Sequence, residues 1–163
     1  MLKLRLYTAQ DAATVLSWCP DEGTYYRWSA GAFGDYPATA EQMNAAVRKN
    51  VPFLVTEDDE PVGFFCLREI KEPQDGVRFA FVILSPEKRG RGMGKEMIRL
   101  GLAYAKEHGK SYAQLAVFAD NDAARYCYRA AGFREVPGQM EVYTVCGEEK
   151  DCYRMEKYGF DLP

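Results

Sequence analysis

The sequence contains no long apolar run. Its longest uninterrupted apolar stretch is the six residues Phe79–Leu84, whereas a membrane-spanning helix needs about 18. Residues 1–11 alternate charged and apolar side chains and include no apolar core as long as that of a signal peptide. The sequence therefore predicts a cytoplasmic protein that has no membrane partner.

Histidine and paired cysteines are scarce. The chain has a single histidine, His108, and its five cysteines form no C-x-x-C pair. We therefore expect no metal site, and no Ser–His or Cys–His nucleophile. An odd number of cysteines without an export signal favours reduced thiols that pack as small apolar side chains.

Positive charge is not in excess either. The 163 residues carry 21 Lys and Arg against 24 Asp and Glu, a formal net charge of −3. Nucleic-acid-binding surfaces are usually basic, so no nucleic-acid partner is expected. Apolar residues make up 47% of the chain, which is too many for a disordered protein. No repeat or linker divides the sequence, and we expect a single domain over residues 1–163.

The hydrophobic periodicity predicts alternating strands and helices. Strand patterns occupy residues 2–7, 52–57, 62–70, 77–84 and 111–118, and two stretches of 133–158. Helix patterns follow capping residues at Thr8 and Thr39, span about 93–108, and follow Asn121. Residues 19–38 are predicted to be irregular. This order is typical of a mixed α/β fold, with an antiparallel meander over 52–84 and a parallel pairing of 77–84 with 111–118.

A glycine-rich loop lies between the strand at 77–84 and the helix at 93–108. Its glycines allow a ligand to approach the backbone, and the helix N-terminus favours an anion. These glycines are Gly90, Gly92 and Gly94, and the cations among them are Arg89, Arg91 and Lys95. The loop therefore predicts a phosphate site. The P-loop pattern fails at Arg89 and Glu96, and the dinucleotide pattern fails at Lys95.

Two motifs resemble the GNAT N-acetyltransferase superfamily. R-x-x-G-x-G, at Arg89, Gly92 and Gly94, follows an apolar strand and S-P. The second motif is N-x-x-A-x-x-x-Y-x-x-x-G-F, and it starts at Asn121. The resemblance, closest to ribosomal-protein N-terminal acetyltransferase-like members, implies a mixed sheet of six to seven strands, splayed between 77–84 and 111–118 and flanked by four helices.

The resemblance also implies acetyl-CoA as cosubstrate. The backbone of Val82, Ile83 and Leu84 would pair with the pantetheine amides. The pyrophosphate would lie on the loop formed by Arg89, Gly90, Arg91, Gly92, Met93, Gly94 and Lys95. Asn121 would either reach the cofactor or cap the following helix.

Tyr128 is the catalytic residue that the resemblance implies, because a tyrosine at this position protonates the departing thiolate. The usual general base is missing: Arg78 and Ala116 occupy the positions where family members carry glutamate. Glu69 is the nearest acidic side chain, and we expect it roughly opposite Arg78, where an ion pair is the simpler interpretation. A water chain or an amine that is already neutral would replace the base.

The acceptor is predicted to be a primary amine, in a small molecule or at a protein N-terminus, which attacks the thioester directly in a ternary complex. The aromatic segment 25–36 would form the acceptor wall, or would pin its own loop. Asp21, Glu22 and Asp35 would attract the amine. Two alternatives stay open, a non-catalytic acyl-CoA sensor and an acyltransferase that uses a larger acyl group such as succinyl. The family resemblance also suggests a homodimer.

Overall fold

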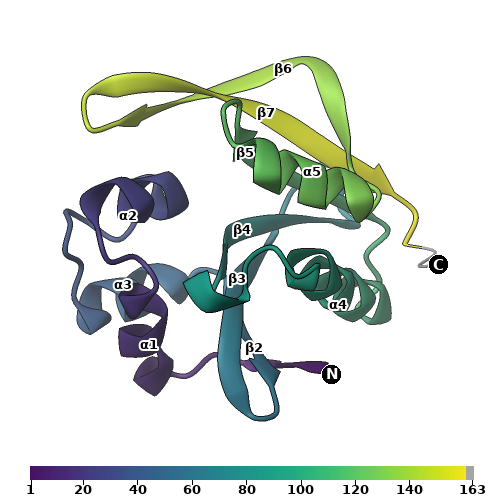
Figure 1. The fold of residues 1–163 in the computed structure, drawn as a ribbon. Helices are drawn as coiled ribbons and strands as arrows, with labels where there is room; N and C mark the ends of the chain where they lie inside the picture. The colour runs from purple at the N-terminus through teal and green to yellow at the C-terminus, as the bar shows by residue number, and fades with distance from the viewer. Residues whose placement is uncertain (161–163) are drawn as a thin grey trace.

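A computed structural model describes residues 1–160, which contain one seven-stranded mixed sheet with the strand order β1-β2-β3-β4-β5-β7-β6 (Figure 1). The strands are β1 (Leu2–Leu6), β2 (Val51–Glu57), β3 (Glu60–Glu69), β4 (Gly76–Leu84), β5 (Tyr112–Phe118), β6 (Arg134–Val145) and β7 (Glu148–Tyr158). The predicted meander is confirmed, because β2, β3 and β4 pair antiparallel in sequence order. The mixed α/β class is confirmed as well.

Helices cover both faces of the sheet. They are α1 (Ala12–Ser17), α2 (Glu22–Ser29), α3 (Ala40–Val47), α4 (Met93–Glu107) and α5 (Asp122–Ala130), with short 3-10 turns η1 (Ala9–Asp11) and η2 (Pro86–Lys88). Figure 1 shows α1, α2 and α3 on one side of β2–β4, and α4 and α5 on the other. Within residues 1–160, none of the helices combines the length and the apolarity that crossing a membrane requires.

Two hydrophobic cores result from the alternation of side chains along the strands. In β3, Phe65 and Leu67 pack into the core beneath α4 and α5. Phe64 and Cys66, on the opposite face, pack with α1, α2 and α3. A central strand that is apolar on both faces is typical of a sheet covered on both sides.

The pairing of β4 with β5 is very short. Only Gly76, Val77 and Arg78 of β4 pair with β5, in parallel, opposite Tyr112–Gln114. From Phe79 onward the two strands have no ladder between them, although β4 continues to Leu84. The expected splay between 77–84 and 111–118 is therefore confirmed, and it begins after the third residue pair.

Residues 19–38, predicted to be irregular, contain helix α2, which brings the number of α-helices in the described residues to five. Asp21 caps α2, because its Oδ1 accepts a hydrogen bond of 2.7 Å from the backbone N–H of Thr24. The helix ends at Ala30, which adopts a left-handed conformation (φ 51°). The prediction of four helices was wrong because this short helix has no clear apolar stripe and contains Gly23 near its start.

The two threonine caps are confirmed, and the helix boundaries shift slightly. Thr8 N–H donates to Asp11 Oδ2 at 2.8 Å, and Thr39 and Gln42 form a reciprocal capping box. The helix after Thr39 ends at Val47. The two strand stretches expected within 133–158 are joined by a tight turn, since β6 ends at Val145 and β7 begins at Glu148.

Candidate functional site

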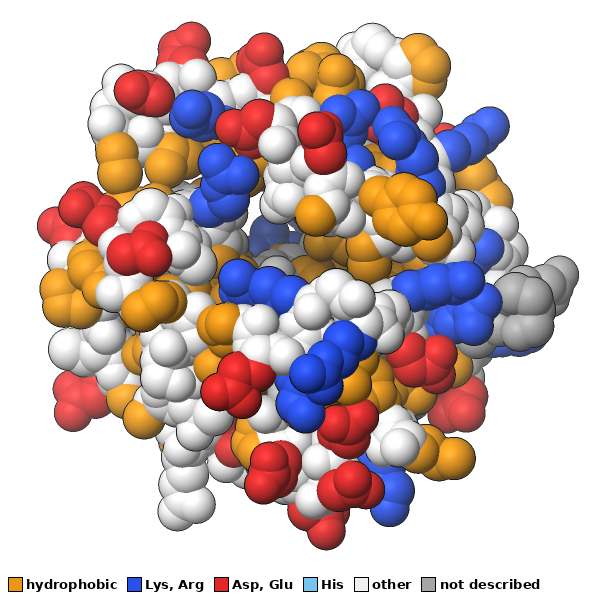
Figure 2. Space-filling view, in the orientation of Figure 1, with side chains coloured by type: hydrophobic (Ala, Val, Ile, Leu, Met, Phe, Trp, Pro, Cys, Tyr) orange, Lys and Arg blue, Asp and Glu red, His pale blue; other side chains and the backbone are white. Residues whose placement is uncertain are grey.

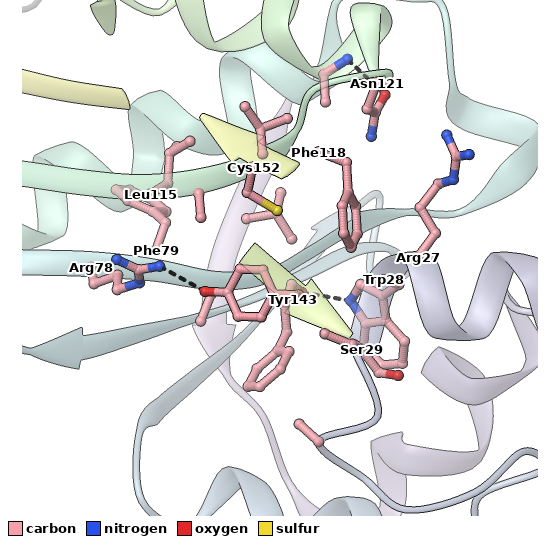
Figure 3. A pocket seen from close by; sticks show the side chains of 18 of the residues that line it. Arg27, Trp28, Ser29, Arg78, Phe79, Leu115, Phe118, Asn121, Tyr143 and Cys152 are labelled. Atoms are coloured by element: carbon pink, nitrogen blue, oxygen red, sulfur yellow. Dashed lines mark hydrogen bonds between the residues drawn. The ribbon is translucent and has the colours of Figure 1, made fainter. Parts of the chain in front are cut away.

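A cavity of about 320 Å³ lies where β4 and β5 separate. Residues from β4, β5, α2, α5 and the β6–β7 hairpin line it (Figure 3). Its polar or ionisable lining residues are Arg27, Trp28, Ser29, Arg68, Arg78, Asn121, Tyr128, Tyr143 and Cys152. Figure 2 shows the molecular surface hollowed in its centre, with Lys and Arg side chains around the hollow.

Along the second half of β4, the main chain has no ladder partner on the side of β5. We call this gap between the two separated strands the seam. A register shift between Phe64 and Cys66 of β3 marks a bulge in the pairing with β4. Phe81 lies at the bulge with φ 55°, a conformation that an aromatic residue rarely adopts. Its carbonyl accepts a hydrogen bond of 2.8 Å from Trp28 Nε1. The bulge therefore lies in the part of β4 that has already separated from β5, just before Val82, and Trp28 supports this geometry.

The three predicted pantetheine-binding residues follow directly. Val82 lines the cavity, and Ile83 and Leu84 continue along the unpaired edge. The side chain of Ile83 packs in the core with α1–α3, so only its main chain faces the seam. Ser85 N–H donates to Val62 O at 2.8 Å, which returns the chain to the sheet.

The glycine-rich loop leads from β4 into α4. Gly90 and Gly92 have φ values of 79° and 76°, and a Cβ on either would meet no atom within 4 Å. These positions thus need glycine for backbone conformation rather than for space. Gly92 is the N-cap of α4 and supplies no capping side chain, so the first N–H groups of the helix, from Met93 onward, remain available to an anion.

The other loop residues differ in their surroundings. Gly94 packs against α5, because a Cβ there would lie 2.8 Å from Cys127 Sγ. Arg89 Nη2 donates to Leu84 O at 3.3 Å, which ties the loop back to the strand. Arg91 is exposed and Lys95 is half-buried at the first turn of α4. The loop adjoins the cavity through β4 but does not line it.

Tyr128 lies on the inner face of α5. Its side chain is 8% exposed, whereas Tyr126 is 75% exposed, so the two tyrosines face opposite ways. Tyr128 lines the cavity, and its hydroxyl takes part in none of the side-chain hydrogen bonds found within residues 1–160. No fully buried side-chain nitrogen or oxygen in these residues lacks a partner, so the hydroxyl oxygen is accessible to solvent. Burial raises the pKa of Tyr128 above its usual value of 10, with a smaller contribution from Cys127. The hydroxyl is therefore protonated at neutral pH.

Asn121 fills the role of a helix cap. Its Oδ1 accepts a hydrogen bond of 3.2 Å from Ala124 N–H, and the residue also lines the cavity (Figure 3). The cap uses the carbonyl oxygen, which leaves the amide N–H₂ group free to donate. The two roles considered from the sequence are thus compatible.

The aromatic segment 25–36 mostly pins itself. Tyr25 donates to Gly34 O at 2.7 Å, Tyr36 donates to Pro20 O at 2.8 Å, and Tyr26 accepts from Tyr36 N–H at 3.0 Å. Of its aromatic residues only Trp28 lines the cavity. Trp28 is therefore the one aromatic residue of this segment placed where an acceptor wall would be, and the other four do not fit that prediction.

The acidic residues expected to attract an amine do not reach the cavity. Asp21 caps α2, and its carboxylate accepts from Thr24. Glu22 and Asp35 are exposed and do not line the cavity. Among the described residues that line the cavity there is no aspartate, glutamate or histidine.

The expected pairing of Glu69 with Arg78 was wrong by one residue. Arg78 is the register partner of Arg68, and Glu69 pairs with Val77. A shift of one residue moves a side chain to the other face of a strand. Glu69 instead forms an ion pair with Lys110 at 3.6 Å and is well exposed, outside the cavity.

Arg78 is held by the β6–β7 hairpin. Its Nη2 donates to Glu141 Oε1 at 3.0 Å, and its Nη1 donates to Gln114 Oε1 at 2.9 Å. Tyr143 donates to the same carboxylate at 2.9 Å, and burial raises the pKa of this tyrosine. Burial alone would raise the pKa of Glu141, but the hydrogen bonds and charge of Arg78 outweigh it and lower that pKa. The carboxylate is therefore ionised and occupied.

Several cavity residues carry no sequence motif. Arg27, Arg68, Tyr143 and Cys152 come from three separate parts of the chain. Strand alternation decides which face of its own strand Arg68 or Arg78 occupies. The observed register of β3 and β4 makes the two arginines direct partners on the same face of the sheet. Within residues 1–160 no group of three or more His, Cys, Asp or Glu side chains is arranged to hold a metal.

Known proteins resemble this chain in sequence. Mycothiol acetyltransferase of Streptomyces avermitilis is 30% identical over 135 residues, which cover 76% of this chain and 43% of that protein. The corresponding protein of Corynebacterium glutamicum is 32% identical over 117 residues, 71% of this chain and 36% of that protein. The chain thus spans about two fifths of the length of these relatives.

Solved structures resemble the fold. Spermidine N-acetyltransferase from Vibrio cholerae, in complex with CoA and spermine, has a TM-score of 0.80 at 20% identity, over 97% of this chain and 95% of that one. AAC(6')-Ib in complex with ribostamycin and coenzyme A has a TM-score of 0.74 at 19% identity, over 96% and 93%. Residues 13–133 match the Acetyltransferase (GNAT) family over most of the chain. The chain therefore belongs to the GNAT acetyltransferase family.

Proposed function

We propose that this chain is an N-acetyltransferase that transfers an acetyl group from acetyl-CoA to a primary amine by direct attack. The observation that carries this proposal is the open seam, where a β4 edge without a ladder to β5 leads into a glycine loop at the uncapped start of α4. The seam offers main-chain groups to an extended amide chain, and the helix start offers N–H groups to a diphosphate. Family membership and the solved CoA complexes support it.

The residues of this seam fit acetyl-CoA one part at a time. The main chain of Val82, Ile83 and Leu84 would pair with the pantetheine amides. The N–H groups and cations of the loop 89–95 would hold the pyrophosphate, and the Asn121 amide would donate toward the cofactor. Bound there, acetyl-CoA supplies an activated acyl thioester.

Tyr128 would act as the proton donor. When the amine nitrogen bonds to the acyl carbon, the carbon–sulfur bond breaks and the sulfur needs a proton. The Tyr128 side chain lines the cavity, and its hydroxyl is protonated at neutral pH and unpartnered among residues 1–160. It would give its proton to the sulfur and recover one from the amine through water, which leaves the amide and free CoA thiol.

The amine has to arrive neutral or lose its proton to water. Among residues 1–160, the cavity lining offers no carboxylate or imidazole that would accept a proton, and Glu69 lies outside it. Glu141 is engaged by Arg78 and Tyr143. We therefore expect the rate to rise with pH toward the pKa of the acceptor amine.

The acceptor would be a small molecule. The relatives named above act, by their names, on mycothiol, spermidine and aminoglycosides, and none of them supports the ribosomal-protein subtype that the sequence suggested. A homodimer, a cytoplasmic location and a single domain over residues 1–163 stay predictions. The last three residues of that expected domain lie outside the described residues.

Calorimetric titration with CoA and acetyl-CoA tests the binding step, and release of free thiol with a panel of amines tests turnover. We expect saturable binding of both ligands and thiol release that depends on an amine. Absence of CoA binding would refute the proposal. Binding without thiol release would favour the sensor, an alternative that the lack of a base in the cavity keeps open. Competition between acetyl-CoA and succinyl-CoA decides the acyl group.

A further inference from the structure

The charge of the cavity is one-sided. Arg27, Arg68 and Arg78 line it, and the described lining residues include no carboxylate. Arg27 lies at the end near Asn121, and Arg78 lies at the opposite end, beside Leu115 (Figure 3). A site built for a polycation would place carboxylates in its wall, because opposite charges attract and like charges repel at short range.

The positive charge at the Arg78 end exceeds the local negative charge. Glu141 is shared between Arg78 at 3.0 Å and Arg154 at 3.3 Å, so one carboxylate serves two guanidinium groups. Arg68 has only a neutral partner, Asn50 Oδ1 at 3.0 Å, and within residues 1–160 it forms no ion pair. At the other end Arg27 is paired with Asp120 at 3.4 Å.

Arg68 and Arg78 are also direct cross-strand neighbours. They are register partners in the antiparallel pair of β3 and β4, and both line the cavity. Like charges directly opposite each other destabilise a sheet unless something lies between them. Both guanidinium groups line one cavity, and each has the planar fork of N–H donors that matches the two oxygens of a carboxylate or phosphate.

We propose that the acceptor is a small primary amine that also carries an oxyanion, a carboxylate or a phosphate, which binds to Arg68 and Arg78. This inference rests on the proposed acetyltransferase function and names its substrate class. The oxyanion would hold the far end of the acceptor while its amine points toward Tyr128 and the seam. A polyamine would place positive charge beside two arginines and bind poorly.

Matched acceptors test the proposal directly. Thiol release is measured with the eighteen common amino acids that carry a primary amine and no thiol, with their primary carboxamides, with phosphoethanolamine and ethanolamine, and with spermidine. We expect at least one amine that carries a carboxylate or phosphate to exceed its matched amine without the anion about tenfold or more in kcat/KM, because hydrogen bonds to charged groups contribute that much. The two pairs of acceptors distinguish a carboxylate from a phosphate.

Arg68→Gln identifies the residue, and Arg48→Gln is the matched control. Arg48 is an exposed cation at the C-cap of α3, outside the cavity. The measured ratio is kcat/KM for an acceptor with the anion divided by kcat/KM for its matched acceptor without it. Arg68→Gln should reduce this ratio about tenfold, while the CoA affinity measured by calorimetry stays at the wild-type value. Arg68→Lys should retain most of the preference, and Arg48→Gln should retain all of it.

Three results would overturn the inference. These are equal or better use of carboxamides or spermidine by the wild type, an equal ratio in Arg68→Gln and Arg48→Gln, or a loss of CoA affinity in Arg68→Gln that accounts for the whole effect. Each of these leaves the acetyltransferase function standing. Absence of thiol release with every amine would instead refute the proposed function, and the substrate class would fall with it.

Discussion

Replacing Tyr128 with phenylalanine removes one hydroxyl from the centre of the cavity. The ring is buried against α4 and the sheet, and its packing partners such as Phe133 remain. The hydroxyl has no hydrogen-bond partner within residues 1–160. No internal hydrogen bond is lost, so we expect the free energy of unfolding to change by less than about 1 kcal/mol.

The effect on turnover should be much larger. General acid–base assistance contributes about 10²- to 10⁴-fold to a rate. A thiol has an ordinary pKa of about 8.5, so a thiolate leaves more easily than most groups. We therefore expect kcat of Tyr128→Phe to fall about 10²-fold, at the lower end of that range. Affinity for acetyl-CoA should stay nearly unchanged, because the main chain of β4 and the loop 89–95 supply the binding groups.

The pH profile gives a second readout. An ordinary tyrosine loses its proton near pH 10, and burial raises the pKa of Tyr128 above that value. The donor form is present below the raised pKa and is lost only when pH rises through it. The wild-type rate should therefore increase from about pH 7 to 9.5 as the acceptor amine deprotonates, with no decline caused by Tyr128.

Thiol release, calorimetry with acetyl-CoA and thermal unfolding measure the three quantities on the same preparations. Tyr126→Phe is the matched control, since Tyr126 is on the same helix and 75% exposed. It should behave as the wild type does. If Tyr128→Phe binds acetyl-CoA normally and turns over the best acceptor within a factor of about three of the wild type, the proton-donor role is wrong.

Three further predictions concern the loop and the fold. Gly92→Ala should weaken CoA binding, and Gly109→Ala is its matched control. Both glycines have positive φ and open surroundings, so both substitutions should lower the melting temperature. Only Gly92→Ala should change the CoA affinity measured by calorimetry. Asp11→Ala should lower stability at pH 7 by about 1–2 kcal/mol. The pKa of Asp11 is lowered, chiefly by the hydrogen bond from Arg5. The stability that Asp11 contributes is therefore present above about pH 4 and is lost as pH falls through the folded pKa. Urea unfolding at several pH values should show this loss for the wild type and not for Asp11→Ala. Gly101→Ala should destabilise by about 1–3 kcal/mol in spite of better helix propensity, because its Cβ would lie 2.6 Å from the buried ring of Phe79.

Local signals in the sequence predicted much of the fold. The capping pairs that begin at Thr8 and Thr39, the alternation along 52–84 and the glycine loop each depend on residues close together in the chain. The motif residues Val82, Asn121 and Tyr128 all reach the cavity for the same reason, since strand β4 and helix α5 place them without help from distant segments.

The predictions that failed concern features that depend on contacts between residues far apart in the sequence. Helix α2 has one strong local signal, the Asp21 cap, and the bond from Trp28 to Phe81 that anchors it to β4 joins residues far apart in the sequence. The register of β3 against β4 is set by the loop between them and by the bulge, which the sequence does not specify. A difference of one residue separates a predicted Glu69–Arg78 ion pair from two facing arginines.

That difference of one residue changes the chemistry expected of the cavity. Had Glu69 faced Arg78, its carboxylate would neutralise the charge there. With Arg68 in that place, the end of the ladder at Arg78 presents excess positive charge where the seam opens. The two motifs concern how the acyl donor would be held. The register of β3 and β4 acts on the acceptor instead, so substitutions at Arg68 should alter which amine is used without altering which cofactor is bound.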